Sequence, residues 1–411
     1  MPTNIHLNNF SHKHKSIAKI FFVGTTVNPL LCDATPAGSV AGNKFQLGLV
    51  TELTNLGHCD IKIISLQPYP MYPKAKKICF GPSWCVLNDK NKAFLIPFIN
   101  IPIIKQITAS LSIFFALVLG LFKSRSSHCI VLVYNVFSPF SIPVLMASKL
   151  FGCKSVAIIA DLPFDGYVFK GWKGFLQRMD FFVQTHIISK FSGVIALTPR
   201  IIDDFCPLLP SIIIEGGIEI EEQTEFRNLK KSDHVVCLYS GALNEINGIS
   251  LLLESFSLIL NSNFRLWIFG DGPLSTLVEQ AVMVDKRIIY WGKIANDQVK
   301  KYQKEATILI NPRISNNKIT NYTFPSKLLE YMSSGRPVIS TKLSGIPKDY
   351  YKHLILLEKE TPVDLARLIE EVCLGKACNI DNIGNDAKKF ITETKNWNYQ
   401  SKVIFNFLSN L

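Results

Sequence analysis

The sequence predicts an α/β protein of two successive domains, each built on a largely parallel sheet. A chain of 411 residues is too long for one compact core and suggests about two domains. Apolar strands alternate with amphipathic helices through the first half, and the same alternation restarts after residue 233. Residues 219–233 between the two halves are charged and polar without periodicity, which is typical of a domain linker.

This pattern divides the chain into four parts. We expect an N-terminal tail at 1–16, a first Rossmann-like domain at 17–225 and a second at 234–390. A C-terminal helix at 391–411 is expected to pack back on the first domain.

Composition and charge narrow the class of protein. Hydrophobic residues make up 48% and charged residues 18%, so the chain can bury sizeable cores and is not disordered. The net charge of +12 favours anionic partners such as nucleotide phosphates, nucleic acid or an anionic membrane face. Nucleic acid is disfavoured because the sequence has no zinc finger, RNA-binding aromatic strand pattern or dense basic helix. Ten scattered cysteines without a CxxC pair favour a reducing, cytoplasmic setting.

One apolar segment bears on membrane association. Residues 107–122 contain no charge, but their 16 residues fall short of the roughly 20 that a spanning helix needs. Lys105 and Lys123 flank the segment, so we expect a core helix or a membrane-docking helix rather than a span. An apolar run at 20–24 is too short for a signal peptide and is expected to be a strand.

The first half shows two candidate ligand positions. A strand at 19–24 is followed by a loop rich in small residues and a helix at 43–56. Gly42 and Asn43 are candidates for close approach by a substrate, or part of a flexible loop without a ligand. Asp161 follows a strand at 155–160, at the edge where ligands of open α/β sheets bind, although an aspartate before Leu-Pro is also a common turn former. Further strands are expected at 61–66, 130–134, 193–198 and 211–214, and further helices at 141–150 and 172–190.

The second half repeats the strand–loop–helix order. Strands are expected at 235–240, 265–269, 288–291 and 307–311, with helices at 249–260 and up to 284. Glycine-containing loops follow several of these strands. Two successive domains with such loops at their strand ends predict a ligand cleft between the domains.

The stretch 322–347 is the most informative. Pro325-Ser326 lead into a short helix that Gly335 ends, and a strand follows at 338–341. Backbone N–H groups beside Ser326, the helix dipole and Lys327 together favour a bound phosphate. Glu330 lies on the same helix face as Lys327. From pattern alone, an ordinary crossover with a salt-bridged surface helix is equally consistent.

Several runs in fixed order carry a family resemblance: YSGAL, NGISLLLESF, LWIFGDGP, IIYWGKI, LINPR and FPSKLLEYMSSGRPVIS. Together they resemble a retaining glycosyltransferase of glycosyltransferase family 4, of the kind found in bacterial surface-polysaccharide synthesis. The resemblance implies a GT-B fold. It also implies a transfer reaction that needs no metal or other cofactor. It implies that the first domain binds a glycan or lipid-linked glycan acceptor, with Gly42, Asn43 and Asp161 as candidate contacts. It implies that the second domain binds a UDP- or GDP-sugar through Gly241, Gly270, Gly272, Pro312, Tyr322, Ser326 and Gly345, with Arg313, Lys327 and Glu330 as the catalytic residues.

The chain departs from the family pattern at three positions. Tyr322 stands where the family has the first acid of its E-x7-E motif, and Ala242 and Asn247 stand where it often has cations. We expect Arg313 and Lys327 to supply the missing charge, with Lys318 a weaker candidate. Two other readings stay open: an epimerase or hydrolase on the same scaffold, and a non-catalytic GT-B subunit. A basic chain with an apolar helix also fits docking on the inner membrane face.

Overall fold

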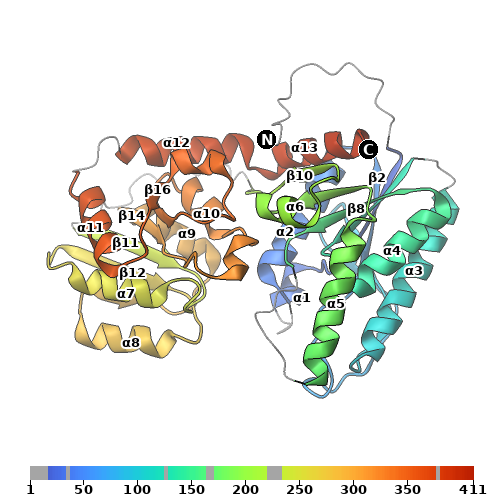
Figure 1. Ribbon diagram of the computed structural model, residues 1–411, viewed down its shortest axis with the longest axis horizontal. Helices are drawn as coiled ribbons and strands as arrows, with labels where there is room; N and C mark the ends of the chain where they lie inside the picture. Colours follow the sequence, from blue (N-terminus) through green and yellow to red (C-terminus); the bar gives the residue numbers. More distant parts are fainter. Residues whose placement is uncertain (1–16, 34–37, 125–127, 163–170, 220–233, 376–379) are drawn as a thin grey trace.

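The protein folds into two α/β domains joined by long C-terminal helices, as seen in a computed structural model (Figure 1). The structure describes residues 17–33, 38–124, 128–162, 171–219, 234–375 and 380–411. The predicted N-terminal tail and most of the predicted linker lie outside these residues.

The first domain contains an eight-stranded sheet in the order β10-β9-β8-β7-β1-β2-β5-β4. All neighbouring strands are parallel except β4 and β5, which form an antiparallel edge. Its strands are β1 (Lys19–Gly24), β2 (Asp60–Ser65), β4 (Ser83–Val86), β5 (Lys92–Leu95), β7 (Cys129–Tyr134), β8 (Lys154–Ile159), β9 (Gly193–Ala196) and β10 (Ser211–Ile213); β3 (Cys79–Phe80) and β6 (Phe98–Ile99) form a separate pair.

Helices cover both faces of this sheet, which is why β7 is buried along its whole length. One core cluster lies beneath α3 and α4, and another lies beneath α2 and the C-terminal helix α13. The helices of this domain are α1 (Pro29–Asp33), α2 (Val40–Asn55), α3 (Ile104–Ser124), α4 (Ser138–Phe151), α5 (Trp172–Ile188) and α6 (Pro199–Phe205).

The second domain contains a six-stranded sheet in the order β13-β12-β11-β14-β15-β16, in which all paired neighbours are parallel. Its strands are β11 (Val235–Ser240), β12 (Phe264–Phe269), β13 (Ile288–Tyr290), β14 (Ile308–Asn311), β15 (Val338–Thr341) and β16 (Ile355–Leu357). Its helices are α7 (Ile249–Leu258), α8 (Ser275–Val284), α9 (Asn296–Glu305), α10 (Lys327–Ser333) and α11 (Pro362–Cys373), with 3-10 turns η1 (Lys318–Asn321) and η2 (Lys348–His353).

The C-terminal helices return the chain to the first domain. Helix α12 (Ile380–Thr394) packs on α10, and α13 (Trp397–Ser409) packs on α2 (Figure 1). The indole of Trp397 meets the ring of Phe45 edge-on, with 5.1 Å between centroids. A β-carbon on Gly48 would overlap this indole, so the glycine lets the two helices approach.

A buried ion pair marks the joint between the domains. Lys395, just after α12, places its Nζ 2.9 Å from Oε1 of Glu215, at the end of the first domain. It also lies 3.4 Å from Asp349 in η2. Ile218 and Asn396 form a parallel β-bridge beside this pair. The chain passes from one domain to the other twice, after Ile218 and again near Lys395, and these contacts hold the two connections together.

Two helices have other bounds than predicted, and one region contains strands where no element was predicted. Helix α2 starts at Val40, three residues early, because Ser39 caps it by accepting the N–H of Gly42. Helix α3 has 21 residues rather than 16, so by length and composition it could cross a membrane. Residues 68–102 contain four strands that the frequent prolines concealed.

Candidate active site

The strand order places the loops of both domains where ligands of such sheets bind. In the second sheet the order reverses between β11 and β14, so a crevice opens outside their carboxyl ends. Gly241 follows β11 there, and Pro312 and Arg313 follow β14. In the first sheet the reversal falls between β1 and β7, next to Gly24 and Tyr134.

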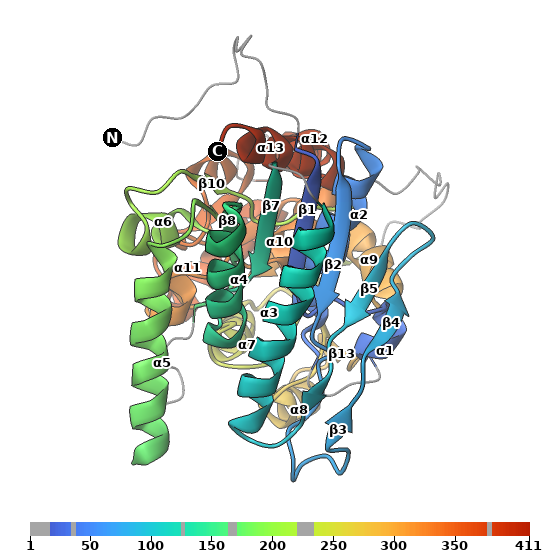
Figure 2. The same cartoon turned by 90° about the vertical axis from the view of Figure 1, so that its right-hand side faces the viewer.

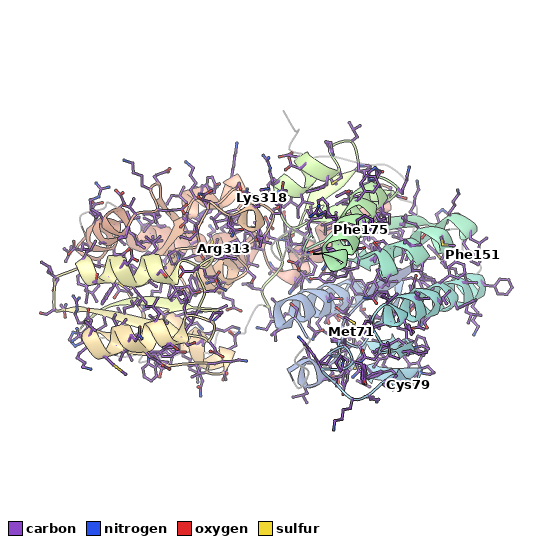
Figure 3. The ribbon with its side chains drawn as sticks, turned by 60° about the horizontal axis from the view of Figure 1, so that its bottom comes forward. Met71, Cys79, Phe151, Phe175, Arg313 and Lys318 are labelled. Atoms are coloured by element: carbon purple, nitrogen blue, oxygen red, sulfur yellow. The ribbon has the colours of Figure 1, made fainter. Side chains whose placement is uncertain are left out.

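Arg313 brings a positive charge to the crevice of the second domain. Its Nη2 donates to Oγ1 of Thr323 at 2.8 Å, whereas its Nε is buried and has no hydrogen-bond partner among the described residues. Burial lowers the pKa of Arg313, and Tyr239 and Asp161 counteract this shift. Figure 3 shows Arg313 and Lys318 on the side of this domain that faces the first. The guanidinium therefore keeps an unused donor for an anion.

Lys327 supplies a second cation beside it. Its Nζ donates to the hydroxyl of Tyr239 at 3.0 Å and lies 4.1 Å from the centroid of that ring. Part of the Lys327 stem is exposed, but the ammonium group is enclosed next to Gly241. Burial lowers the pKa of Lys327 to about 7; the neighbouring Arg313 lowers it too, and Glu330 opposes the shift. An incoming phosphate would restore the charged form.

Glu330 faces the first domain from the first turn of α10. Its Oε1 lies 3.8 Å from Nζ of Lys44 on α2, and it accepts a long hydrogen bond of 3.4 Å from Asn296. The side chain is 32% exposed, and both contacts are weak. A ligand hydroxyl could replace them at little cost, so the carboxylate is available to a ligand.

The predicted donor-site glycines have structural reasons of their own. Gly241 and Gly270 adopt φ angles of +146° and +130°, which side chains rarely tolerate. A β-carbon on Gly270 would clash with the carbonyl of Gly241, one on Gly272 with Leu243, and one on Gly345 with Thr323. The loops around the crevice therefore pack directly on each other's backbone.

Pro312 and Ser326 are two further residues predicted for the donor site. Pro312 is buried, and its carbonyl touches the backbone of Gly248, which ties the loop after β14 to the loop after β11. Ser326 is exposed immediately before α10 and makes no side-chain cap. Since α10 has seven residues, its dipole is weak. The cationic side chains therefore supply most of the positive potential at this site.

The side chain of Tyr322 points toward the first domain. Its hydroxyl donates to Oδ2 of Asp204 on α6 at 2.7 Å, and its ring packs near Phe205. Asp204 also pairs with Arg200 at 2.7 Å. In this arrangement Tyr322 links the two domains, and the donor contact assigned to it stays a prediction.

The acceptor-side candidates separate into structural and accessible residues. Gly42 and Asn43 lie inside α2, not in the preceding loop. The amide of Asn43 is buried and exchanges two hydrogen bonds with the backbone of Val27, so its observed role is to fix that loop. Gly42 lies close to the hydroxyl of Tyr134, at the carboxyl edge of the sheet.

Asp161 lies at this same edge and faces the other domain. Burial raises the pKa of Asp161, and Asn135 and Arg313 oppose that shift, which places the Arg313 charge within electrostatic reach across the cleft. The side chain remains exposed to solvent within the cleft. The structure therefore brings Asp161, Arg313, Lys327 and Glu330 to the facing edges of the two sheets.

Asn135 is a residue that the sequence did not reveal. It follows β7, is buried, and has a φ of +61°, a left-handed value that asparagine adopts more readily than most residues other than glycine. Its Oδ1 accepts the N–H groups of Ala160 and Asp161 at 2.9 and 3.0 Å. A lone asparagine after a strand carries no sequence signal, because its role depends on the neighbouring strand.

The neutral positions in the loop after β11 are occupied locally. The amide of Asn247 donates to the carbonyl of Ala242 at 3.0 Å, and the hydroxyl of Tyr239 donates to the same carbonyl at 2.8 Å. This loop offers no cation, so Lys327 and Arg313 are the nearby positive charges that the geometry supplies.

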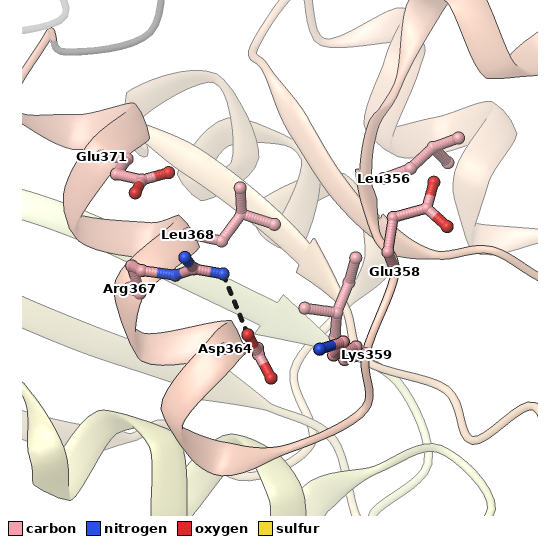
Figure 4. A pocket seen from close by; sticks show the side chains of 8 residues that line it. Leu356, Glu358, Lys359, Asp364, Arg367, Leu368 and Glu371 are labelled. Atoms are coloured by element: carbon pink, nitrogen blue, oxygen red, sulfur yellow. Dashed lines mark hydrogen bonds and ion pairs between the residues drawn. The ribbon is translucent and has the colours of Figure 1, made fainter.

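A surface pocket and the distribution of metal-ligating side chains also bear on ligand binding. A surface pocket of about 200 Å³ lies between β16 and α11, where Arg367 pairs with Asp364 (Figure 4). None of the predicted site residues lines it. Among the described residues, no three His, Cys, Asp or Glu side chains gather as metal ligands would.

Comparison with known proteins assigns the class. Residues 234–374 match the family described as glycosyl transferases group 1. Over nearly the whole chain, the fold matches sucrose-phosphate synthase from Thermosynechococcus elongatus, with a TM-score of 0.67, 13% identity, and 96% and 98% of the two chains covered. Anabaena HepE in complex with UDP matches with a TM-score of 0.65, 13% identity and 96% and 100% coverage. The protein has the GT-B fold of glycosyltransferases.

Curated relatives align with part of the chain. The gpi3 subunit of phosphatidylinositol N-acetylglucosaminyltransferase from Schizosaccharomyces pombe is 30% identical over 130 residues, which is 30% of this chain and 27% of that protein. TuaH of Bacillus subtilis, named as a teichuronic acid biosynthesis glycosyltransferase whose assignment is provisional, is 26% identical over 203 residues, or 47% and 49% of the two chains. This chain thus spans at most about half the length of the curated relatives it matches.

Proposed function

We propose that this protein is a retaining glycosyltransferase that transfers a sugar from a UDP- or GDP-sugar to a glycan or lipid-linked glycan. The observation that supports this proposal most directly is the pair of cations, Arg313 and Lys327, at the point where the strand order of the second sheet reverses. A nucleotide diphosphate carries the complementary negative charge. Structures of HepE, which has a similar fold, contain UDP and UDP-glucose.

The donor would lie with its diphosphate against Arg313 and Lys327. The unpartnered Nε–H of Arg313 and the Lys327 ammonium would then stabilise the negative charge that develops on the leaving phosphate. Glu330 would accept hydroxyl hydrogen bonds from the nucleoside ribose. Because these side chains provide the positive charge, the reaction is proposed to need no metal or other cofactor.

In the transfer step, the anomeric C–O bond to the phosphate breaks while the acceptor oxygen bonds to the anomeric carbon from the same face. The acceptor proton passes to the leaving phosphate oxygen, so no separate protein base is required. Asp161 lies opposite Arg313 and would hold an acceptor hydroxyl. A lipid-linked acceptor in surface-polysaccharide synthesis would place the enzyme in the cytoplasm, peripherally on the inner membrane face.

Kinetic measurement on site variants tests this assignment. Lys327→Ala and Glu330→Ala should each lose transfer, whereas Lys342→Ala, which disrupts only a surface pair with Glu358, should not. Retention of full transfer by both site variants would show the assignment to be wrong. The anomeric configuration of the product, read by NMR, tests retention separately.

The products distinguish this function from its alternatives. A sugar found on an acceptor supports the transferase, whereas a changed free nucleotide-sugar supports an epimerase or hydrolase. Donor binding without turnover supports a non-catalytic subunit, the reading that Ala242, Asn247 and Tyr322 motivate. A thermal-shift panel of UDP-, GDP-, ADP- and dTDP-sugars identifies the donor, because binding to the native state stabilises it.

A further inference from the structure

Three adjacent helices of the first domain expose apolar side chains on one face. Helix α4 packs between α3 and α5, and Figure 2 shows the three side by side in front of the sheet. Twelve large apolar side chains on them, each between 40% and 72% exposed, define what we call the apolar face: Ile104, Ile107, Leu111, Phe115, Leu119 and Phe122 of α3, Ile142, Met146 and Leu150 of α4, and Phe175, Met179 and Phe182 of α5.

The spacing of these residues shows that the exposure is systematic. On α3 they recur every three or four residues, opposite the buried stripe of Ala109, Ile113 and Leu117. Twelve such side chains leave roughly 1,000 Å² of apolar surface in water, more than the largest patch of a typical monomer. A contiguous surface of this size indicates an interaction site.

We propose that the apolar face docks the protein on a bilayer containing anionic phospholipids. The proposal specifies the surface that would support the peripheral membrane location proposed above. Charge favours this occupant: positions 90–160, which include α3 and α4, contain no Asp or Glu. Lys123 and Lys149 are exposed in the last turns of α3 and α4, where long basic side chains can reach lipid headgroups.

The same charges disfavour a second copy of the chain on this face. Two apolar faces in contact would offer these lysines little opposite charge, because Asp180 is the one acidic residue of α3, α4 and α5. Asp180 already accepts hydrogen bonds from Ser138 and Gln184. A bilayer with anionic lipids can accommodate the apolar side chains between its acyl chains and bind the lysines through its headgroups.

The packing of α3 indicates that it lies on the membrane and does not cross it. Its inner stripe belongs to the core of the first domain. A β-carbon on Gly120 would lie 2.5 Å from the ring of Phe21 on β1, so the helix is fitted closely to the sheet. Crossing a bilayer would pull this stripe out of the core, whereas docking inserts only the outer side chains.

Flotation of the full-length protein with vesicles tests the proposal. We expect it to float with phosphatidylcholine vesicles that contain phosphatidylglycerol, and at least ten times less with pure phosphatidylcholine or in 0.5 M NaCl. The double variant Phe115→Ser/Leu119→Gln should lose at least ten-fold of this binding. The matched control Leu260→Gln/Val284→Ser changes two side chains of the second domain that are each 89% exposed, and it should bind as the wild type does.

Three results would overturn the proposal: no flotation of the wild-type protein, equal flotation of the Phe115/Leu119 variant, or a dimer in size-exclusion chromatography that this variant dissociates. The last would assign the face to a second copy. Donor-induced thermal stabilisation separates this test from the proposed function. A variant that loses vesicle binding but keeps that stabilisation bears on docking alone, and a protein that floats but binds no nucleotide-sugar contradicts only the transferase.

Discussion

The Lys327 ammonium nitrogen lies 3.0 Å from the Tyr239 hydroxyl and 4.1 Å from the centroid of the same ring. This enclosure lowers the Lys327 pKa to about 7. At pH 8 the side chain is therefore mostly neutral in the free protein. A bound diphosphate should raise the Lys327 pKa, so that the amine takes up a proton from the buffer. We expect donor binding at pH 8 to take up close to one proton. Calorimetry in phosphate and in Tris should give different apparent enthalpies, and Lys327→Met should remove the difference.

The lowered Lys327 pKa also predicts how stability depends on pH. The folded-state pKa of about 7 lies below the ordinary value of 10.5, so between these pH values the unfolded state binds more protons. Raising the pH from 7 to 9 should thus stabilise the wild type relative to Lys327→Met. The gain should be below about 1.4 kcal/mol per pH unit, since part of the stem is exposed. Thermal melts of both proteins across this range measure it; parallel curves would contradict the lowered pKa.

Glu330→Gln tests the role of the carboxylate without changing its shape. A hydrogen bond from a ligand hydroxyl to a charged acceptor contributes about 1.5–3 kcal/mol, so we expect donor affinity to fall about ten- to one-hundred-fold. Lys44→Met provides the control, because Lys44 contacts Glu330 only at 3.8 Å across the cleft. Donor affinity should be unchanged or higher in that variant. A loss of the same size in both would show that the ion pair, and not the carboxylate, matters for binding.

These predictions concern residues that the sequence located well. The run FPSKLLE marked Lys327 and Glu330, and strand β15 has the bounds that periodicity predicted. Five of the six strands in the second sheet were predicted; β16, with only three residues, was not. Long apolar strands between glycine turns carry a strong local signal, whereas a three-residue strand depends on its neighbour for definition.

The sequence is least informative where long-range contacts decide the structure. Asn43 looked like a substrate ligand because it followed a glycine-rich loop, but its amide is bound to the backbone of Val27. The donor contact of Tyr322 stays a prediction, and the structure adds a hydrogen bond from its hydroxyl to Asp204, 118 positions away. Neither partner could be inferred from residues nearby in the chain.

The bond between Tyr322 and Asp204 leads to a prediction that separates two roles of the tyrosine. If Tyr322 acts by joining the domains, Tyr322→Phe and Asp204→Asn should change the donor KM equally, and the double variant should match either single one. Each change should be small, about ten-fold or less, because the contact is partly solvated. A larger effect of Tyr322→Phe alone, unaffected by Asp204→Asn, would support direct contact with the donor.

The joint at Lys395 predicts a large loss of stability. Lys395→Met would leave the carboxylate of Glu215, whose side chain is 1% exposed, without its cation. Breaking a buried ion pair on one side costs about 3–5 kcal/mol. Lys342→Met removes an exposed pair with Glu358 and should cost less than about 1 kcal/mol. Urea denaturation of the two variants provides the comparison; similar losses would mean that the Glu215 site admits water.

Asn135 should position Asp161 without taking part in the chemistry. Asn135→Ala removes the acceptor of two backbone N–H groups, and we expect a loss of about 1–3 kcal/mol in stability. Asn135→Asp keeps an oxygen in the same place but sets a buried carboxylate beside that of Asp161, so it should recover little of the loss. Because Asp161 is proposed to hold an acceptor hydroxyl, Asn135→Ala should raise the KM for the acceptor at least several-fold and leave donor-induced thermal stabilisation intact. Equal effects on donor and acceptor would instead indicate a general loosening of the first domain, since the hydrogen bonds of Asn135 lie within that domain.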